Sequence, residues 1–265
     1  MPELPEVEAV CRKLRKQAIG ATLTAAHIER RRITLPQDPS YVEAQISGRS
    51  IERIHRRGKN ILIALSGGVT MRVHLRMTGN LCVIPDFRLR AARLSAWFEL
   101  ADGRGLLFED TRGLGALTIE NGSALENLGP EPLSRQFTPE VLARSALESR
   151  QPAKLFLLDQ RRIAGLGNIY AAEALFAAGV DPRKPIGSLS GPRLRNLHGA
   201  IVRILRDAVK SACRAYSRPG GFQEAEEYPL AVYGREGERC VRCEGVIRRI
   251  TQGGRSTFYC PKCQG

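Results

Sequence analysis

The start of the chain can place a reactive amine beside two carboxylates. The sequence begins MPELPE, so removal of Met1 would leave Pro2 as a free secondary amine next to Glu3 and Glu6. At pH 7 roughly one terminal amine in seven is neutral and nucleophilic, against about one lysine side chain in 2,500. Attack of a proline amine on a carbonyl-like carbon gives an iminium ion with no N–H to lose, so the positive charge persists and draws electrons. Prolines at these positions are also typical of the first turn of a helix, and both interpretations can hold together.

Four of the seven cysteines have a spacing typical of a zinc site. Two Cys-x-x-Cys pairs are separated by 16 residues, and they consist of Cys240, Cys243, Cys260 and Cys263. Pairs at the two ends of a hairpin bring four thiolates to one tetrahedral ion, and a filled shell indicates a structural zinc. We expect strands over 245–251 and 255–259, with the turn at 252–254. Metal binding would supply the folding energy that so short a segment lacks; the alternatives are free thiols or a redox pair.

A His-x-Glu motif, His27-Ile28-Glu29, also occurs in the chain. Zinc nucleobase deaminases use such a motif together with a Pro directly before a Cys-x-x-Cys pair. Neither cysteine pair here has that Pro, and four cysteines already fill the shell of the ion. We therefore predict that this segment is part of a strand.

The charge of the chain indicates an anionic partner. Lysine and arginine number 41 against 27 aspartate and glutamate residues, which gives a net charge of +14 over 265 residues. The charge is rich in arginine and recurs in every segment, which favours nucleic acid over an acidic membrane surface. The alternative is a protein that is merely basic. The chain has no apolar run long enough to cross a bilayer and no signal peptide, so a cytoplasmic protein is expected.

Three short segments have groups suited to phosphate. Residues 165–168, Gly-Leu-Gly-Asn, stand before a helical run, where amides and the helix N-terminus favour an anion; a plain capped helix is the alternative. Arg255 follows two glycines at the hairpin turn, from which it can contact phosphate, or it is a solvated turn residue. Lys59 precedes an apolar strand, where most lysines are ordinary surface charges. The absence of a GxxxxGK[ST] motif gives no indication of nucleotide hydrolysis.

The hydrophobic pattern changes twice along the chain. Residues 5–19 have apolar side chains at helical spacing, and Gly20 ends this helix. From residue 21 to 119, short aliphatic runs alternate with turn signals, which is typical of a β-sandwich or barrel. After a Gly-Pro-Glu-Pro linker at 129–132 the spacing becomes helical. The expected strands are 50–54, 60–65, 70–75, 81–85, 95–100, 105–109 and 116–119, and the expected later helices are 139–148, 154–160, 168–178 and 189–212.

These segments together resemble formamidopyrimidine-DNA glycosylase from end to end. The matching motifs are PELPEVE at 2–8, RGK at 57–59, HLRMTG at 74–79, DQ at 159–160, AGLGNIY at 164–170, VYGREG at 232–237 and GRSTFYCPKCQ at 254–264. The resemblance implies an α+β fold. We expect an N-terminal helix and β-sandwich over 1–128, a linker over 129–138, a helix-two-turn-helix DNA-binding domain over 139–230 and a zinc-finger hairpin over 231–265.

The resemblance also implies an activity and a partner. Family members bind double-stranded DNA that contains a damaged base, and they flip that base because its sugar carbon cannot be attacked inside the stack. They excise oxidised purines such as 8-oxoguanine and formamidopyrimidines and then nick the strand by β,δ-elimination. The chain is therefore expected to be a bifunctional DNA glycosylase and AP lyase of base excision repair, with one structural Zn2+. We expect a monomer in the bacterial cytoplasm, associated with DNA and not with a membrane.

Roles for single residues follow from the resemblance, position by position. Pro2 is the nucleophile that forms a Schiff base at C1′, Glu3 is the general acid/base at the sugar, and Glu6 supports the site. Lys59 is a proton donor and phosphate contact. Arg255 is the finger arginine, a proton donor for δ-elimination that grips the phosphates beside the lesion. The implied DNA-contact positions are His74, Met77, Arg93, Arg112, Leu114, Lys154 and Asn168, although the family often has His at position 93.

Two departures from the family pattern bear on specificity. Met77 and Arg112 match two of the three residues that fill the hole left by a flipped base, but Leu114 stands where the third is usually Phe. Leucine can wedge between base pairs, yet it stacks less well than an aromatic ring. The segment 216–232, with Pro-Gly-Gly-Phe-Gln at 219–223, resembles the loop that covers the flipped base, but its flanks differ; the alternative is an ordinary glycine-rich loop.

Two other functions explain part of the sequence. Endonuclease VIII-like glycosylases, which prefer oxidised pyrimidines, share Pro2 and Glu3 but tend to have Gly where this chain has Leu4. Leu4 and the segment 219–223 favour the purine-directed class. A non-catalytic nucleic-acid-binding zinc-ribbon protein explains the charge and the ribbon, but it does not explain the Pro2–Glu3 start together with Lys59.

Overall fold

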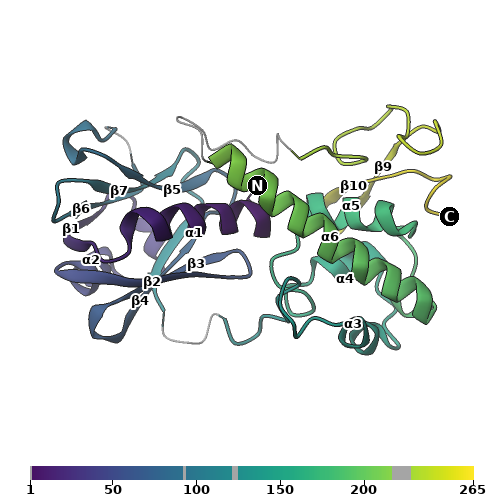
Figure 1. The fold of residues 1–265 in the computed structure, drawn as a ribbon, viewed down its shortest axis with the longest axis horizontal. Helices are drawn as coiled ribbons and strands as arrows, with labels where there is room; N and C mark the ends of the chain where they lie inside the picture. Colours follow the sequence, from purple (N-terminus) through teal and green to yellow (C-terminus); the bar gives the residue numbers. More distant parts are fainter. Residues whose placement is uncertain (1, 92–93, 121–124, 217–227) are drawn as a thin grey trace. The chain divides into compact units, whose positions relative to one another are not determined.

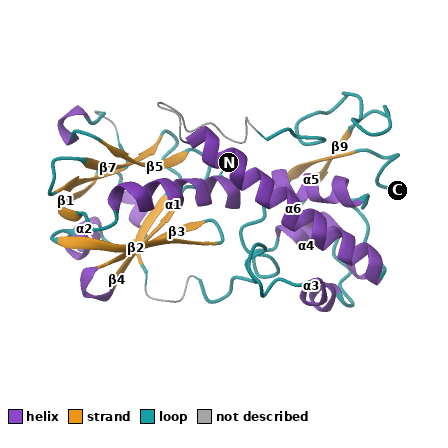
Figure 2. Ribbon diagram, in the orientation of Figure 1, coloured by secondary structure: helices purple, strands orange, loops and turns teal. Residues whose placement is uncertain are grey.

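The computed structural model describes residues 2–91, 94–120, 125–216 and 228–265 (Figure 1). The chain divides into two compact units, Met1–Glu126 with Ala212–Ala225 and Asn127–Ser211 with Glu226–Gly265. The first unit combines helices with an antiparallel sheet, and the second combines helices with a two-stranded hairpin (Figure 2). The expected α+β fold is therefore confirmed. Within the described ranges, no helix is both long and apolar enough to span a membrane.

Helix α1, Leu4–Ala18, confirms the expected N-terminal helix. Glu3 precedes it in an extended conformation and forms a capping box with Glu6, whose carboxylate accepts the Glu3 N–H at 2.8 Å. The apolar face of the helix, which includes Val7, Val10 and Leu14, is buried in the core of the first unit. The helix thus holds its N-terminal end in a fixed place on the sheet.

The strands of the first unit form an antiparallel sheet folded into two layers. One layer has the order β5-β7-β6-β1 and the other β2-β3-β4-β8, and a short pairing of β1 with β2 joins them. Side chains from both layers share one core. Helix α1 packs against β2, β3 and β5 of this sandwich (Figure 1). This is the expected β-sandwich. The strands are β1 Thr22–Ile28, β2 Arg49–Arg57, β3 Asn60–Leu65, β4 Val69–His74, β5 Gly79–Ile84, β6 Ala96–Leu100, β7 Gly105–Asp110 and β8 Ala116–Ile119.

Helix α2, Pro39–Ile46, is an element that the sequence pattern did not predict. Asp38 caps it by accepting the Ser40 N–H at 3.0 Å, and Pro39 stands in its first turn. Only two residues of this helix, Val42 and Ile46, are buried, so its hydrophobic pattern is too short to indicate a helix.

The predicted strand at His27 is confirmed by β1. Short 3-10 turns lie at Arg31–Thr34, Ser66–Gly68, Phe87–Leu89 and Ile186–Ser188.

The second unit contains the helices that the later periodicity predicts. They are α3 Pro139–Ala146, α4 Ala153–Leu158, α5 Asn168–Ala178 and α6 Gly191–Tyr216, of which the last residues, from Ala212 on, belong to the first unit. Helix α5 has the predicted bounds because Gly167 is its N-cap and Gly179 ends it in the left-handed conformation, at φ 66°. Helix α4 and helix α5 pack on each other and carry two of the predicted DNA-contact residues.

The hairpin of the second unit has strands β9, Arg248–Gln252, and β10, Arg255–Tyr259. Gln252 pairs with Arg255, so the turn consists of Gly253 and Gly254 alone, and the three-residue turn expected at 252–254 is wrong. Both glycines have positive φ, 53° and 72°. Two consecutive left-handed residues match the twist of the flanking strands, which is why a tighter turn forms. Strand β9 also begins later than expected.

Candidate functional site

The predicted nucleophile and its carboxylates lie together at the start of α1. Pro2 is buried, and Glu3 and Glu6 are each 1% exposed. The positive end of the helix dipole favours the ionised form of carboxylates placed there. Glu6 is committed to the Glu3 backbone N–H, so it fixes the conformation of Glu3. Once Met1 is removed, this arrangement would place the Pro2 amine beside two carboxylates, which is what the predicted chemistry requires.

Arg56 and Glu8, two residues that the sequence analysis missed, connect the turn that carries Lys59 to helix α1. Lys59 lies in this two-residue turn, between β2 and β3 and after Gly58, which has φ 58°. The Arg56 guanidinium, only 9% exposed, pairs with Glu8 of α1 at 3.2 Å and donates to the Gly58 carbonyl oxygen at 2.8 Å. Burial opposes ionisation of Glu8, but hydrogen bonds from Arg12 and the charges of Arg56 and Arg15 give it a lowered pKa. The Glu8–Arg56 pair therefore links the Lys59 turn to the helix that carries Pro2.

His74 lies beside this turn, since it pairs with Asn60 across β3 and β4. Its Nδ1 accepts the Arg76 N–H at 3.0 Å. Burial, together with the positive charges of Arg76, Lys59 and Arg72, lowers the pKa of His74 to about 3. The imidazole is therefore neutral at physiological pH, and its Nε2 retains the proton. A neutral ring in this state can donate one hydrogen bond, for example to a phosphate oxygen.

We expect His74 to make the protein less stable in acid. Its folded pKa lies below its unfolded value of about 6.5, so between about pH 6.5 and pH 3 the unfolded chain binds a proton that the folded chain does not. The stabilisation is complete above about pH 6.5 and is lost as the pH falls through this window. His74→Asn keeps an acceptor for the Arg76 N–H but cannot titrate. Its melting temperature should therefore fall less with pH than that of the wild type.

The control for this measurement is His27→Asn, because the His27 side chain is 52% exposed. The measurement is the melting temperature of the wild type, His74→Asn and His27→Asn across this pH window. An identical pH dependence for the wild type and His74→Asn would contradict the assignment.

The three predicted void-filling residues lie on two neighbouring loops of the first unit. Met77, 38% exposed, precedes β5, while Arg112, exposed, and Leu114, half-buried, follow β7. Gly79 and Asp110 pair where β5 begins and β7 ends, so the two loops leave the sheet at one end. The structure thus brings Met77, Arg112 and Leu114 to one edge of the sandwich.

The predicted phosphate-contact residues of the second unit meet at the hairpin. Asn168, the first residue of α5, donates through Nδ2 to the Ser256 carbonyl oxygen at 3.1 Å. Gly167, not Asn168, is the cap of the helix. Arg255, exposed, adjoins Ser256 directly after the glycine turn. The N-terminus of α5 and the hairpin arginine therefore occupy one neighbourhood.

Lys154 is placed in a way that its sequence did not indicate. Its side chain is 0% exposed, and its ammonium donates to the Ser256 carbonyl oxygen and to Thr257 Oγ1, both at 2.6 Å. A buried charge is retained only when it is well hydrogen-bonded. In this conformation Lys154 holds the hairpin beside Arg255, and its proposed DNA contact remains a prediction.

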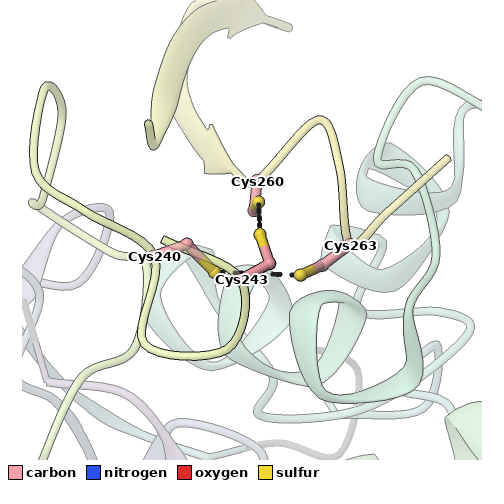
Figure 3. A group of neighbouring side chains, drawn as sticks. All are labelled: Cys240, Cys243, Cys260 and Cys263. Atoms are coloured by element: carbon pink, nitrogen blue, oxygen red, sulfur yellow. Dashed lines mark hydrogen bonds between the residues drawn. The ribbon is translucent and has the colours of Figure 1, made fainter. Parts of the chain in front are cut away.

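The four predicted zinc ligands converge at the base of the hairpin (Figure 3). Their sulfur atoms all lie within 4.8 Å of one another, with 3.8 Å between Cys240 and Cys263 and 3.5 Å between Cys243 and Cys260. A tetrahedral zinc with bonds of about 2.3 Å requires sulfur atoms about 3.8 Å apart, so the residues fit the ion. The chain thus supplies four ligands for one structural zinc. Two of these cysteines, Cys240 and Cys260, also belong to a buried hydrophobic cluster that includes Ala172 and Phe176 of α5.

Glu173 is a further anchor that the sequence analysis missed. This carboxylate of α5 is 3% exposed and accepts the N–H groups of Ala231, Val232 and Tyr233 at 2.8, 2.9 and 2.9 Å. Three donors satisfy a buried charge and fix the chain as it enters the zinc ribbon. The available signal was a single acidic residue inside the otherwise apolar run of α5.

Two predicted features lie outside the described residues. They are Arg93 and most of the segment proposed to cover the flipped base, including 219–223.

Family models match successive parts of the chain. The formamidopyrimidine-DNA glycosylase N-terminal domain matches residues 1–117, the formamidopyrimidine-DNA glycosylase H2TH domain matches 128–217, and the zinc finger found in FPG and IleRS matches 237–265. The formamidopyrimidine-DNA glycosylase of Chloroflexus aggregans is 42% identical over 276 aligned positions, which cover 100% of this chain and 98% of the relative. That of Carboxydothermus hydrogenoformans is 39% identical over 271 positions, with 100% of both chains covered.

Solved structures agree with these matches. The complex between the Lactococcus lactis Fpg and an abasic site containing DNA has a TM-score of 0.89 and 30% identity, with 99% of each chain covered. A structure of MutM in complex with carbocyclic 8-oxo-G containing DNA has a TM-score of 0.88 and 29% identity, again with 99% of each chain covered. The chain therefore belongs to the formamidopyrimidine-DNA glycosylase family, DNA-repair enzymes that are both DNA glycosylases and AP lyases.

Proposed function

We propose that this chain excises oxidised purines, such as 8-oxoguanine and formamidopyrimidines, from double-stranded DNA through a Schiff base on Pro2, and that it then cuts the strand by β,δ-elimination. The observation that carries the proposal is the burial of Pro2 beside Glu3 and Glu6, each 1% exposed, at the positive end of α1. The names of the relatives and the DNA in the solved neighbours support the substrate class.

In the proposed reaction one amine serves two steps. The Pro2 nitrogen bonds to C1′ as the bond from C1′ to the base breaks, and Glu3 then protonates O4′, so that the bond from C1′ to O4′ breaks and the sugar ring opens to an iminium. The resulting iminium has no N–H to lose and therefore acidifies the C2′ proton. Loss of that proton expels the phosphate on the 3′ side, and a further elimination expels the phosphate on the 5′ side. Lys59 and Arg255 are the proposed proton donors.

The reaction requires the damaged nucleotide to leave the base stack, because C1′ is not accessible within the duplex. Met77, Arg112 and Leu114 are proposed to fill the hole. His74, Arg93, Lys154 and Asn168 are proposed DNA contacts. We also propose a monomer that works on DNA in the bacterial cytoplasm, with functional domains divided near residues 128, 138 and 230.

Borohydride trapping tests the proposed function. Incubation with an 8-oxoguanine·cytosine duplex and borohydride should give a covalent adduct on Pro2, identified by mass spectrometry of the N-terminal peptide, and an undamaged duplex should give none. A preference for thymine glycol would instead favour the endonuclease VIII-like class. DNA binding without any adduct, in a zinc-loaded protein with Pro2 free, would favour a binding module.

Leu114→Phe should tighten binding to lesion DNA. An aromatic ring stacks on the bases beside the hole, and such contacts are worth about 0.5–1.5 kcal/mol beyond burial, so we expect roughly 2- to 10-fold tighter binding. Titration with a duplex that contains a stable abasic-site analogue measures the effect. Leu147→Phe, at a surface leucine that is 71% exposed, is the matched control. Equal affinity of the wild type and Leu114→Phe would reject the expectation.

A further inference from the structure

A buried carboxylate lies between the two loops that carry the proposed void-filling residues. Asp110, the last residue of β7, is 5% exposed. Its Oδ2 accepts the Gly115 N–H at 2.7 Å, and its Oδ1 accepts the Arg112 N–H at 3.2 Å. These two bonds close the loop 111–115 on itself, so that its backbone is folded around one charged group.

The same carboxylate also binds the other loop through Thr78. The Thr78 hydroxyl donates to Asp110 Oδ1, and its oxygen in turn accepts the Arg112 N–H at 3.2 Å. Thr78 follows Met77 directly in the chain. A single hydroxyl therefore connects the Met77 loop to both the carboxylate and the backbone of the Arg112 loop. Hydrogen bonds to a charged group are stronger than those between neutral groups.

The loop 111–115 has little room to move away from this arrangement. The Arg30 guanidinium donates to the Asp110 carbonyl oxygen at 2.9 Å. A Cβ added at Gly113, which has φ 61°, would lie 2.6 Å from the Arg30 guanidinium, and one at Gly115 would lie 2.5 Å from the Phe108 ring. The loop is therefore tightly packed at its base, while Arg112 on this loop and Met77 on the neighbouring loop are exposed.

We propose that Thr78 and Asp110 form a hydrogen-bonded clamp that makes the Met77 and Arg112–Leu114 loops one rigid wedge. Both are positioning residues, because they act through the side chains at the tips. A wedge that is already rigid before it enters the duplex loses less conformational entropy on insertion than two independent loops would. The inference rests on the proposed function, in which these tips fill the hole left by the flipped base.

Thr78→Val and Thr78→Ser form a matched pair that tests the clamp. Valine keeps the shape of threonine but removes the hydroxyl, whereas serine keeps the hydroxyl. In the free protein, amide hydrogen exchange in residues 111–115 should be faster in Thr78→Val and unchanged in Thr78→Ser. Single-turnover excision of 8-oxoguanine should fall about 10- to 100-fold in Thr78→Val, the range for loss of a hydrogen bond to a charged group, and serine should restore it.

Two further measurements separate positioning from general damage. The affinity of Thr78→Val for undamaged duplex should match that of the wild type, because the clamp contributes no phosphate contact, and its thermal unfolding should remain a single cooperative transition, because the change is confined to two loops. Wild-type exchange and excision in Thr78→Val would overturn the proposal, as would a Thr78→Ser variant that fails equally or a parallel loss of undamaged-DNA affinity. If the wild type itself neither excises 8-oxoguanine nor forms a borohydride adduct, the proposed function fails, and the exchange measurement still decides whether the clamp exists.

Discussion

A chain whose position-2 nitrogen is blocked should lose both base excision and strand cleavage. In Pro2→Leu the bulky second residue keeps Met1 in place, so the nitrogen at position 2 is an amide with no nucleophilic lone pair. We expect the borohydride adduct to disappear and single-turnover cleavage to fall on the order of 10⁴- to 10⁶-fold, the range for removal of a covalent nucleophile. Mass spectrometry of the intact protein verifies the state of the N-terminus in each preparation.

The matched control for this experiment is Pro5→Ala, because Pro5 shares the helix start but has no role in the proposed chemistry. Affinity for lesion DNA should remain in Pro2→Leu, since the proposed phosphate contacts come from other residues. Undiminished cutting by a protein with a verified blocked terminus would show that another group attacks the sugar.

Loss of zinc should unfold the hairpin and thereby weaken the binding of lesion DNA. Zinc contributes about 10–16 kcal/mol of folding free energy to small cysteine-ligated segments. Cys260→Ala, or prolonged chelation, should therefore unfold β9 and β10 and leave Arg255 without a fixed position. We expect lesion-DNA binding to weaken about 10- to 100-fold, as for loss of a well-placed arginine contact. Hydrogen exchange of residues 248–259 and DNA titration measure the two effects.

Restoration by added zinc and a cysteine control make this test specific. Chelated wild type should recover both order and affinity when zinc is returned, whereas Cys260→Ala should not. Cys82→Ala, at a cysteine of β5 outside the ribbon, should bind DNA as the wild type does. Full lesion affinity in a protein shown to be free of zinc would contradict the structural role of the ion.

Much of the fold was predictable because the signals are local. The apolar spacing of α1, the bounds of α5 between Gly167 and Gly179, and the short aliphatic strands can each be read within a window of a few residues. Helix α2 was not predicted, because only two of its side chains are buried and they give no clear helical spacing. The hairpin turn was misjudged by one residue, because register depends on the partner strand as well as on the turn sequence.

The site was predictable only as far as its motifs are contiguous. The N-terminal MPELPE and the two cysteine pairs indicate an amine nucleophile and a zinc without any tertiary information. The supporting residues could not be found in this way. Thr78 and Asp110 stand 32 positions apart, and Glu173 binds amides 58 to 60 positions away.

The sequence by itself determined the kinds of chemistry available: a proline at position 2 that becomes an amine if Met1 is removed, four cysteines at ligand spacing and an excess of positive charge. Tertiary structure alone decided which polar groups are withdrawn from water and which remain at the surface. It buried Lys154 against the hairpin, made His74 a neutral ring, and placed Asp110 under two loops. The physical reason is that hydrophobic spacing acts over a few residues, whereas the desolvation of a charge and the partners that compensate it depend on which distant segments meet.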